Sequence, residues 1–394
     1  MLLGNRKSSC FARNQKIVKS RIRARANLRY RSASAVVVYW HEGNLVFDNY
    51  LAGSKINADP VVCRILDFCS AWRSVPEVSA YLGDFQEASV RRTLESLTRH
   101  AMLHRSDQPA DKREAALAGW GNWLPAAGFF HFSTRDVEFA KDPVAAFRDL
   151  QQRAKTQPMP RVGKSFPGAR RVPLPADSHA GEFPRILKER RTWRKFSAKP
   201  VPLDNLARLL QLTFGVQGWA EIPGLGRVPM KTSPSGGSLH PIEAYVLARN
   251  VKGLQPGSYY YDARRHDLVW LRRSVSQSSL KKMVGHQWWF AKTPFLVLMT
   301  AVFARPQWKY DYPRVYRAVL LEAGHLCQTF CLTATWLGLA PFCTIALADT
   351  KWEGLLGIDG VRESLIYAAG AGLRPKDEKQ AHIGKGADPR LLPS

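Results

Sequence analysis

Residues 233–241 read Ser-Pro-Ser-Gly-Gly-Ser-Leu-His-Pro and lead directly into an apolar segment, residues 244–248, that has the pattern of a strand. Two adjacent glycines allow backbone N–H groups to approach a flat ligand closely, and the serines add hydrogen-bond donors. An ordinary turn before a strand would explain the glycine pair alone, but it explains the whole run less well. The candidate ligand-binding residues of this loop are Pro234, Ser235, Gly236 and Gly237.

A basic segment lies upstream of this loop, where residues 189–196 read Glu-Arg-Arg-Thr-Trp-Arg-Lys-Phe. Three guanidinium groups and a hydroxyl within five residues can hold a phosphate through bidentate, charge-assisted hydrogen bonds. In a chain as basic as this one, such a cluster also arises as an ordinary solvated surface. The candidate phosphate ligands are Arg190, Arg191, Thr192 and Arg194.

A lysine–tyrosine pair precedes the longest apolar stretch of the chain, within the segment Trp-Lys-Tyr-Asp-Tyr-Pro at residues 308–313. Lys309 and Tyr310 have ordinary pKa values of about 10, so both are protonated at neutral pH. Pro313 suits the first position of a helix, whose positive end would disfavour the ammonium and favour a phenolate. Either residue is then a candidate base, although alone the pair would be a surface loop in most proteins.

The chain from Pro184 onward alternates helices and strands in an α+β order. The continuous apolar run of residues 295–303 predicts a strand buried on both faces. The apolar stretch of residues 318–340 is interrupted by Glu322 and His325, so it predicts a buried helix rather than a membrane span. Further expected elements are a helix at 203–212, a hairpin of 258–261 with 268–271, and a last strand at 364–368.

Taken together and in this order, the three motifs resemble those of the SagB/McbC-type dehydrogenases, which belong to the nitroreductase superfamily. The resemblance covers about residues 184–374, and the Pro-Ser-Gly-Gly loop is its most specific part. It implies an α+β domain that binds FMN, usually as a homodimer with the flavin at the subunit interface. It also implies oxidation of thiazolines or oxazolines to thiazoles or oxazoles in a ribosomally made peptide, with a cyclodehydratase as a candidate partner.

The same resemblance assigns roles to residues of this chain. Arg374, which follows two glycines, is an additional candidate phosphate ligand, whereas Trp193 departs from the smaller pairs that are commoner in the family. The expected catalytic residues are Lys309 and Tyr310. The expected cofactor-binding residues are Arg190, Arg191, Thr192, Arg194, Pro234, Ser235, Gly236, Gly237 and Arg374.

A small module precedes this domain. Residues 36–38 and 45–47 predict a hairpin, and helices are expected at about 61–69, 74–82 and 86–101, followed by a wing at 102–104. This winged-helix pattern resembles the PqqD-like modules that recognise leader peptides in peptide-maturing enzymes. A leader peptide would then add to the sheet edge near Val36–Tyr39.

At 394 residues the chain is expected to form more than one domain. Residues 1–34 are basic, carry no acidic residue and are expected to be a disordered arm. Residues 35–106 form the winged-helix module, and residues 184–394 form the catalytic domain. Residues 107–183 are expected to be an irregular linker that packs on the catalytic domain.

The chain is strongly basic, with 58 lysines and arginines against 32 aspartates and glutamates. Such a field attracts nucleic acids, acidic peptides, phosphorylated cofactors and anionic membranes. Six cysteines without a CxxC pair exclude a disulfide scaffold, and with the lack of a secretory signal they favour the cytoplasm. Cys327 and Cys331 are expected to be buried core thiols rather than ligands, and no metal site is expected.

Two other functions stay open. One is a nitroreductase-like enzyme that acts on small molecules with NAD(P)H as donor, which the appended module disfavours. The other is a DNA-binding regulator with a flavin-sensing domain, supported by the winged helix and the charge. We expect a precursor peptide as partner, no specific nucleic acid binding and no membrane association.

Overall fold

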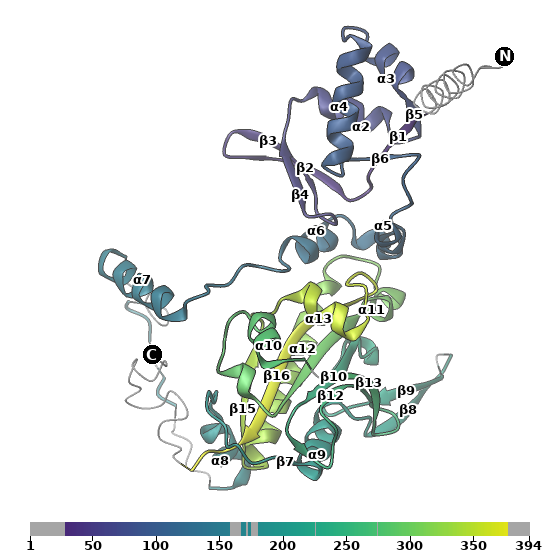
Figure 1. The fold of residues 1–394 in the computed structure, drawn as a ribbon. Coiled ribbons are helices and arrows are strands. Elements are labelled where there is room, and N and C mark those ends of the chain that lie inside the picture. Colours follow the sequence, from purple (N-terminus) through teal and green to yellow (C-terminus); the bar gives the residue numbers. More distant parts are fainter. Residues whose placement is uncertain are drawn as a thin grey trace, which may run out of the picture. The chain divides into compact units, whose positions relative to one another are not determined.

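The computed structural model describes residues 28–157, 167–170, 172–174, 180–224, 226–273 and 275–376. The chain divides into two compact units, residues 1–134 and residues 135–394 (Figure 1). We call them the N-terminal and C-terminal units and describe each by itself. Within the described ranges, no helix combines the length and the apolar character needed to cross a membrane.

The N-terminal unit contains an antiparallel sheet of three strands followed by three helices. The strands are β2 (Val36–His41), β3 (Asn44–Asn49) and β4 (Ser54–Asn57), in that order across the sheet. The helices are α2 (Val61–Phe68), α3 (Val75–Leu82) and α4 (Glu87–Arg99). The predicted hairpin and all three predicted helices are therefore present. Their apolar faces meet in one core that includes Phe47, Ile65, Val78 and Leu94.

A second small sheet begins within the expected disordered arm. Strand β1 (Arg29–Ser32) pairs with β5 (Arg73–Ser74) on one side and β6 (Leu103–Arg105) on the other. Tyr30, which lies between Arg29 and Arg31 in sequence, is buried in the core. The alternation of a strand places this one side chain inward, and it anchors β1 within the basic stretch. Residues 1–27 of the expected arm lie outside the described residues. The predicted wing overlaps β6, which closes this sheet.

Four helical segments lie within the described part of the expected irregular linker, between residues 107 and 157. Helix α5 (Lys112–Leu117), the 3-10 helix η1 (Ala118–Trp123) and α6 (Ala126–Ser133) belong to the N-terminal unit. Helix α7 (Pro143–Thr156) belongs to the C-terminal unit. The side chains of Asp111 and Asp142 cap α5 and α7 by accepting backbone N–H groups, which sets both helix starts. The boundary between the units thus differs from the expected boundaries at residues 106 and 183.

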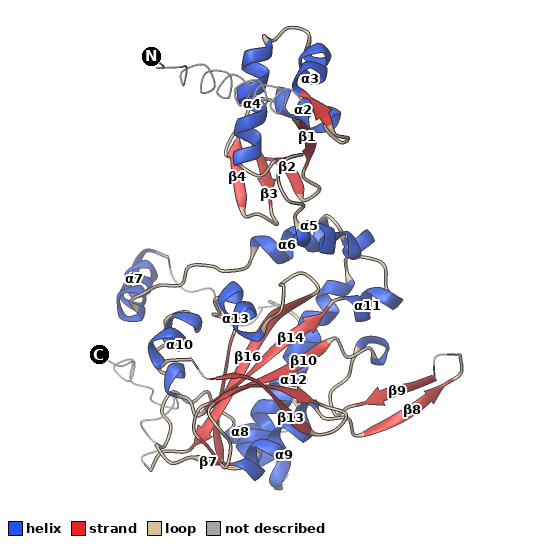
Figure 2. Ribbon diagram, turned by 45° about the vertical axis from the view of Figure 1, so that its right-hand side comes forward, coloured by secondary structure: helices blue, strands red, loops and turns tan. Residues whose placement is uncertain are grey.

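The C-terminal unit is built on an antiparallel sheet of six strands in the order β13-β12-β10-β14-β16-β15 (Figure 2). These strands are β10 (Ile242–Ala248), β12 (Gly257–Asp262), β13 (Asp267–Arg273), β14 (Phe295–Val302), β15 (Leu339–Thr344) and β16 (Glu363–Leu373). The predicted strands and hairpin are present, although β16 continues five residues beyond the predicted end at residue 368, and the predicted α+β fold is confirmed.

Helices cover both faces of the sheet. Helix α12 (Val315–Trp336) packs against β10, β15 and β16 and against α9 (Leu203–Phe214). Helices α10 (Gln277–Met283) and α13 (Asp349–Leu356) contribute to a core with alternate residues of β10 and β14. Phe295 faces Phe330 of α12, whereas its neighbour Leu296 belongs to the opposite core. Burial on both faces explains the continuous apolar run of β14.

Smaller elements frame the site. Helix α8 (Glu182–Glu189) precedes the arginine segment, and α11 (Ala304–Lys309) precedes Tyr310. Strands β8 (Gly218–Ile222) and β9 (Gly226–Met230) form a hairpin, and the 3-10 turn η2 (Gly236–Ser238) lies within the glycine loop. The short strands β7 (Val201–Pro202) and β11 (Val251–Lys252) pair in parallel. The 3-10 turn η3 (Phe290–Lys292) leads into β14.

Candidate active site

The glycine loop contacts the lysine–tyrosine pair. Gly237 has a φ of +67°, in the left-handed region that favours glycine. A Cβ at Gly237 would lie 2.9 Å from Lys309 Nζ and 2.9 Å from Tyr310 Oη. The backbone of Gly237 therefore lies so close to both functional groups that a side chain at this position would clash with them. Two motifs that are about 70 residues apart in sequence are brought together here.

A buried glutamate of α12 holds the glycine loop. Ser235 Oγ donates to Glu322 Oε2 at 2.5 Å and accepts from the backbone N–H of His240 at 2.9 Å. Burial raises the pKa of Glu322 to about 7, and the Ser235 hydrogen bond partly opposes that shift. Glu322 was noticed in the sequence only as an interruption of an apolar stretch. Its role as a loop support was missed because its partner is 87 residues away.

His240 at the end of the loop is neutral at neutral pH. Its ring is buried, and burial lowers its pKa to about 4. With Nε2 protonated, the ring donates to the Pro229 carbonyl oxygen at 3.0 Å, which ties the loop to the β8–β9 hairpin. The loop is thus fixed from two sides, by α12 through Ser235 and by the hairpin through His240.

The lysine–tyrosine pair ends one helix instead of beginning the next. Lys309 is the last residue of α11, and Tyr310 is its C-cap, whereas α12 begins only at Val315. The expected position of the pair at a helix N-terminus is therefore wrong. Helix α11 was not predicted from the sequence, and Pro306 lies in its first turn, where the missing N–H is not needed. The Lys309 ammonium lies 5.4 Å from the centroid of the Tyr310 ring.

The arginine segment surrounds a buried tryptophan. The backbone N–H of Trp193 donates to the Pro341 carbonyl oxygen. The Arg374 guanidinium carbon lies 5.4 Å from the centroid of the Trp193 ring. Arg194 is partly buried, and its Nε is a buried donor without an acceptor among the described residues. An anion would supply that acceptor, so the donors of this segment fit a phosphate.

The other three expected phosphate ligands of this segment lie at the end of α8 or just after it. Arg191 directs its Nη1 to the carbonyls of Lys188 and Arg190, at 2.6 and 2.8 Å, and its side chain is exposed. Arg190 is the C-cap of α8, and Thr192 is partly buried beside it. Arg191 therefore already uses part of its donor capacity on its own backbone.

One copy of the chain does not bring the two halves of the expected site together. Trp336, the last residue of α12, donates to Glu182 of α8 at 3.1 Å, whereas Tyr316 near the start of α12 stacks on Phe303 beside α11. These contacts are separated by about 30 Å of helix. Both views place α8 and α11 at opposite ends of α12 (Figures 1 and 2).

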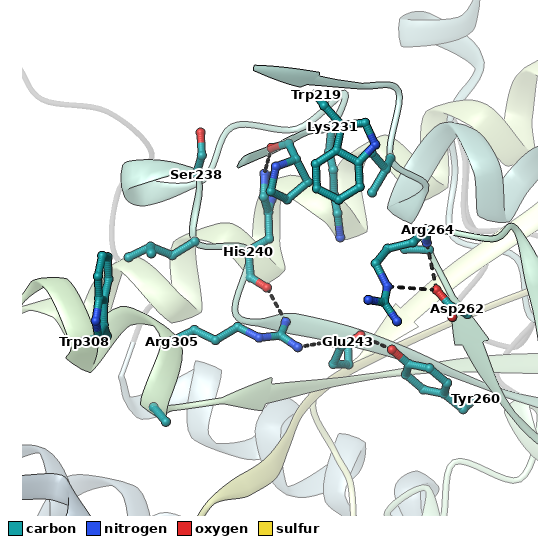
Figure 3. Close-up of a pocket in the computed structure, with 15 residues that line it drawn as sticks. Trp219, Lys231, Ser238, His240, Glu243, Tyr260, Asp262, Arg264, Arg305 and Trp308 are labelled. Carbon is teal, nitrogen blue, oxygen red and sulfur yellow. Dashed lines mark hydrogen bonds and ion pairs between the residues drawn. The ribbon is translucent and has the colours of Figure 1, made fainter. Parts of the chain in front are cut away.

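A cavity of about 700 Å³ borders the glycine loop (Figure 3). Arg305 and Glu243 form an ion pair on its floor, and Arg305 also donates to the His240 carbonyl at 2.7 Å. Trp219 of β8 and Trp308 of α11 contribute aromatic walls. Lys231 also lines this space. Lys231, Trp219, Glu243 and Arg305 were not singled out from the sequence, because the cavity is assembled from separate elements.

Two buried thiols and one partly buried thiol form a cluster beside the C-terminal half of α12. The Sγ atoms of Cys327, Cys331 and Cys343 all lie within 4.8 Å of one another, and the Tyr367 hydroxyl donates to Cys343 Sγ at 3.4 Å. Cys327 and Cys331 are buried, as expected of core thiols, and together with Cys343 they lie close enough to one another to bind a metal ion. Cys343 of β15 joins them across the helix–sheet packing, whereas His325 is exposed on α12.

Comparison with known proteins gives the family. The model of the nitroreductase family matches residues 187–373. MJ1384 of Methanocaldococcus jannaschii, which is named as a nitroreductase, is 30% identical over 173 residues, covering 44% of this chain and 83% of that protein. The trifolitoxin-processing protein TfxB of Rhizobium leguminosarum bv. trifolii is 28% identical over 172 residues, 42% of this chain and 46% of TfxB.

The microcin B17-processing protein McbC of Escherichia coli is 32% identical over 142 residues, 35% of this chain and 51% of McbC. The matches thus span about half the length of TfxB and McbC. Among solved structures, the E. coli McbBCD microcin synthetase complex aligns with a TM-score of 0.48 and 22% identity, over 66% of this chain and 92% of that chain. The match with MJ1384 extends over most of that protein, and the chain therefore belongs to the nitroreductase family of flavin-dependent oxidoreductases.

Proposed function

We propose that the chain is an FMN-dependent dehydrogenase that matures a ribosomally synthesised peptide by oxidising azoline rings to azoles. The contact of Gly237 with Lys309 and Tyr310 carries this proposal, because it places two candidate bases against a loop suited to a flat ring. The similarity to TfxB and McbC, both named as processing proteins of peptide toxins, supports the substrate class.

Two groups of residues fit FMN, one suited to its phosphate and the other to its ring system. Arg194, with its unsatisfied buried Nε, and Arg374 would bind the phosphate together with Arg190 and Thr192. The open backbone of Gly236 would lie against the isoalloxazine ring, next to the approach of Gly237 to Lys309 and Tyr310. When bound, FMN supplies the acceptor for the hydride that the ring loses on oxidation.

The protein supplies the base and the geometry. Lys309 or Tyr310 takes the acidic ring proton, and the other member of the pair helps to orient the substrate. Both functional groups are held against Gly237, and Glu322 fixes the loop through Ser235. The base therefore stays at a fixed position relative to the loop while the substrate enters from the cavity side.

The active site is completed by a second copy of the chain. Since the arginine segment and the Lys309–Tyr310 pair lie at opposite ends of α12, a homodimer would place one half of each site against the other half from its partner. Helix α12 supports such an interface, because Leu320 and Leu321 project outward and Leu321 is 62% exposed. A homodimer would bury these side chains.

The N-terminal unit is proposed to bind the leader segment of the precursor. Both outer strands of its β2-β3-β4 sheet, β2 and β4, have an unpaired edge among the described residues. An extended peptide can add to such an edge. The net positive charge of the chain favours an acidic leader.

The test is a single-turnover assay with a precursor peptide that already carries azoline rings, in which mass spectrometry follows the loss of two hydrogens per ring. We expect a yellow protein that carries out this loss without NAD(P)H. The alternative function, suggested by MJ1384, is reduction of small molecules by NAD(P)H. Rapid NAD(P)H oxidation with nitroaromatic acceptors and no change in the peptide would favour that alternative.

A further inference from the structure

Lys231 projects into the cavity beside the glycine loop. It follows β9 directly, and Figure 3 shows its ammonium between His240 and Arg264. Burial lowers the pKa of Lys231, with Glu243 and Glu322 acting in the opposite direction. A lysine that is taken out of water in this way is costly unless a counter-ion compensates it.

The other charged groups of the cavity already have partners. Arg305 pairs with Glu243, which also accepts from Tyr260 at 3.0 Å, and Arg264 pairs with Asp262 at 3.5 Å. Glu322 accepts from Ser235, and His240 is neutral. Within the described part of the chain, Lys231 has neither a hydrogen bond nor an ion pair. The Lys231 ammonium is therefore a cation of the cavity lining that has no directly bonded partner.

We propose that Lys231 binds a carboxylate of the substrate within this cavity. The bound group would be the free C-terminal carboxylate or an acidic side chain of a peptide, close to the ring that is oxidised. The ammonium supplies a charge-assisted hydrogen bond, and Trp219 and Trp308 provide walls for the adjoining apolar part. This inference rests on the proposed function, since it names the feature of the peptide that the cavity recognises.

The position of Lys231 explains why a carboxylate fits better than a cation or a neutral group. A bound cation would be repelled by the Lys231 ammonium, because Glu243 and Glu322 already have partners. A neutral group would leave the ammonium without a counter-ion. The flavin is the rival occupant, since it too carries acceptors. The flavin content of the Lys231 variants therefore distinguishes the two occupants.

The experiment uses isothermal titration calorimetry on the flavin-loaded full chain with hippurate and with its neutral amide. Hippurate imitates the C-terminal carboxylate of a peptide and carries an aromatic ring for the tryptophan walls. We expect the wild type to bind hippurate about ten-fold to a hundred-fold more tightly than the amide, the range of one charge-assisted hydrogen bond. Lys231→Met and Lys231→Gln should lose this preference, and Lys231→Arg should retain most of it.

Arg227→Met is the matched control, since it removes a positive charge from the exposed face of the same hairpin, where Arg227 lies 5.3 Å from the centroid of the Trp219 ring. This variant should keep the preference. The proposal is overturned by equal binding of acid and amide in the wild type, by no binding of hippurate at millimolar concentration, or by a preference that survives in both neutral variants.

The flavin spectrum of each sample separates this inference from the proposed function. Loss of flavin from both neutral Lys231 variants would place the lysine in the cofactor site and overturn the carboxylate assignment. A wild type that lacks flavin but still prefers hippurate through Lys231 would contradict the proposed function and leave the carboxylate site standing.

Discussion

Gly237 lies so close to Lys309 that an added Cβ would come within 2.9 Å of the lysine Nζ. Glycine is favoured at this position for two reasons, because a side chain would meet Lys309 and because the backbone is left-handed. Any side chain at this position must strain the loop and displace the functional group of the lysine. The loop and the pair are therefore one structural unit, and they can be tested as one.

Gly237→Ala should lower peptide oxidation strongly while the protein remains folded. The left-handed conformation costs an alanine about 1–2 kcal/mol, and the displaced Lys309 loses its position as a base. Single-turnover oxidation and the thermal midpoint would be measured together. Gly253→Ala is the matched control, because Gly253 also has a left-handed backbone (φ +79°) and a Cβ there meets no atom within 4 Å. Equal activity of the two variants would contradict the assigned contact.

Lys309→Met and Tyr310→Phe should retain FMN but oxidise the peptide about 10²–10⁴-fold more slowly, since each removes a candidate general base or its partner. The two rates identify which residue takes the proton. Tyr312→Phe serves as the control, because Tyr312 belongs to the same segment and is half exposed. Loss of flavin in both variants would show that the pair supports the cofactor and does not act on the substrate.

Much of this pair's environment could be predicted from the sequence, and part of it could not. The glycine loop and the Lys309–Tyr310 pair carry their chemistry in contiguous residues, so local motifs were sufficient to identify them. The helix that ends at Lys309 was missed, because a segment of six residues is too short to show apolar periodicity of its own. Glu322 and Lys231 gain their roles only from partners or neighbours that are remote in sequence.

The domain boundary shows the same limit. Residues 107–183 are rich in proline, which favoured an irregular linker, yet Asp111 and Asp142 cap two helices within it. Short capped helices are stabilised by packing more than by propensity, and composition does not report packing.

Arg190→Ala combined with Arg194→Ala should yield folded protein that copurifies with little FMN. Each lost charge-assisted contact with the phosphate should cost about 1.5–3 kcal/mol of binding. The absorbance ratio of flavin to protein measures the effect. Arg191→Ala is the control, since its guanidinium donates to backbone carbonyls, and it should keep most of the flavin. A double variant that stays fully yellow would place the phosphate elsewhere.

The stability of the C-terminal unit should depend on pH through Glu322. Its folded pKa of about 7 lies above the ordinary value of 4.5, so the folded state binds the proton more tightly. The contribution of this group to stability is complete below pH 4.5 and is lost as the pH rises through 7. The loss is on the order of 3 kcal/mol.

Urea unfolding from pH 5 to pH 8 would measure this contribution as the difference between the wild type and Glu322→Gln. The glutamine can still accept from Ser235 but does not titrate. The difference is needed because burial also raises the pKa of Asp349, to about 6. Parallel pH profiles for the two proteins would show that Glu322 is not protonated in the folded state.

The last prediction concerns the N-terminal unit, where peptide and DNA compete as ligands. A groove of about 490 Å³ follows β4 and α4, and it is lined by Arg92, Arg99 and both polar and apolar residues. On the opposite edge, near the expected Val36–Tyr39 site, Trp40 is 70% exposed. An unpaired strand edge beside two arginines suits an extended acidic peptide.

We therefore expect the full chain to bind a labelled precursor peptide in fluorescence polarisation. Arg92→Glu combined with Arg99→Glu should weaken binding about ten-fold if β4 is used, whereas Trp40→Ala should do so if the β2 edge is used. Affinity for DNA duplexes should be independent of sequence and should fall steeply between 50 and 200 mM salt, because it rests on phosphate contacts. Sequence-selective DNA binding that resists salt, with no affinity for the peptide, would contradict peptide recognition and favour a regulator, since base-specific contacts survive the release of counterions.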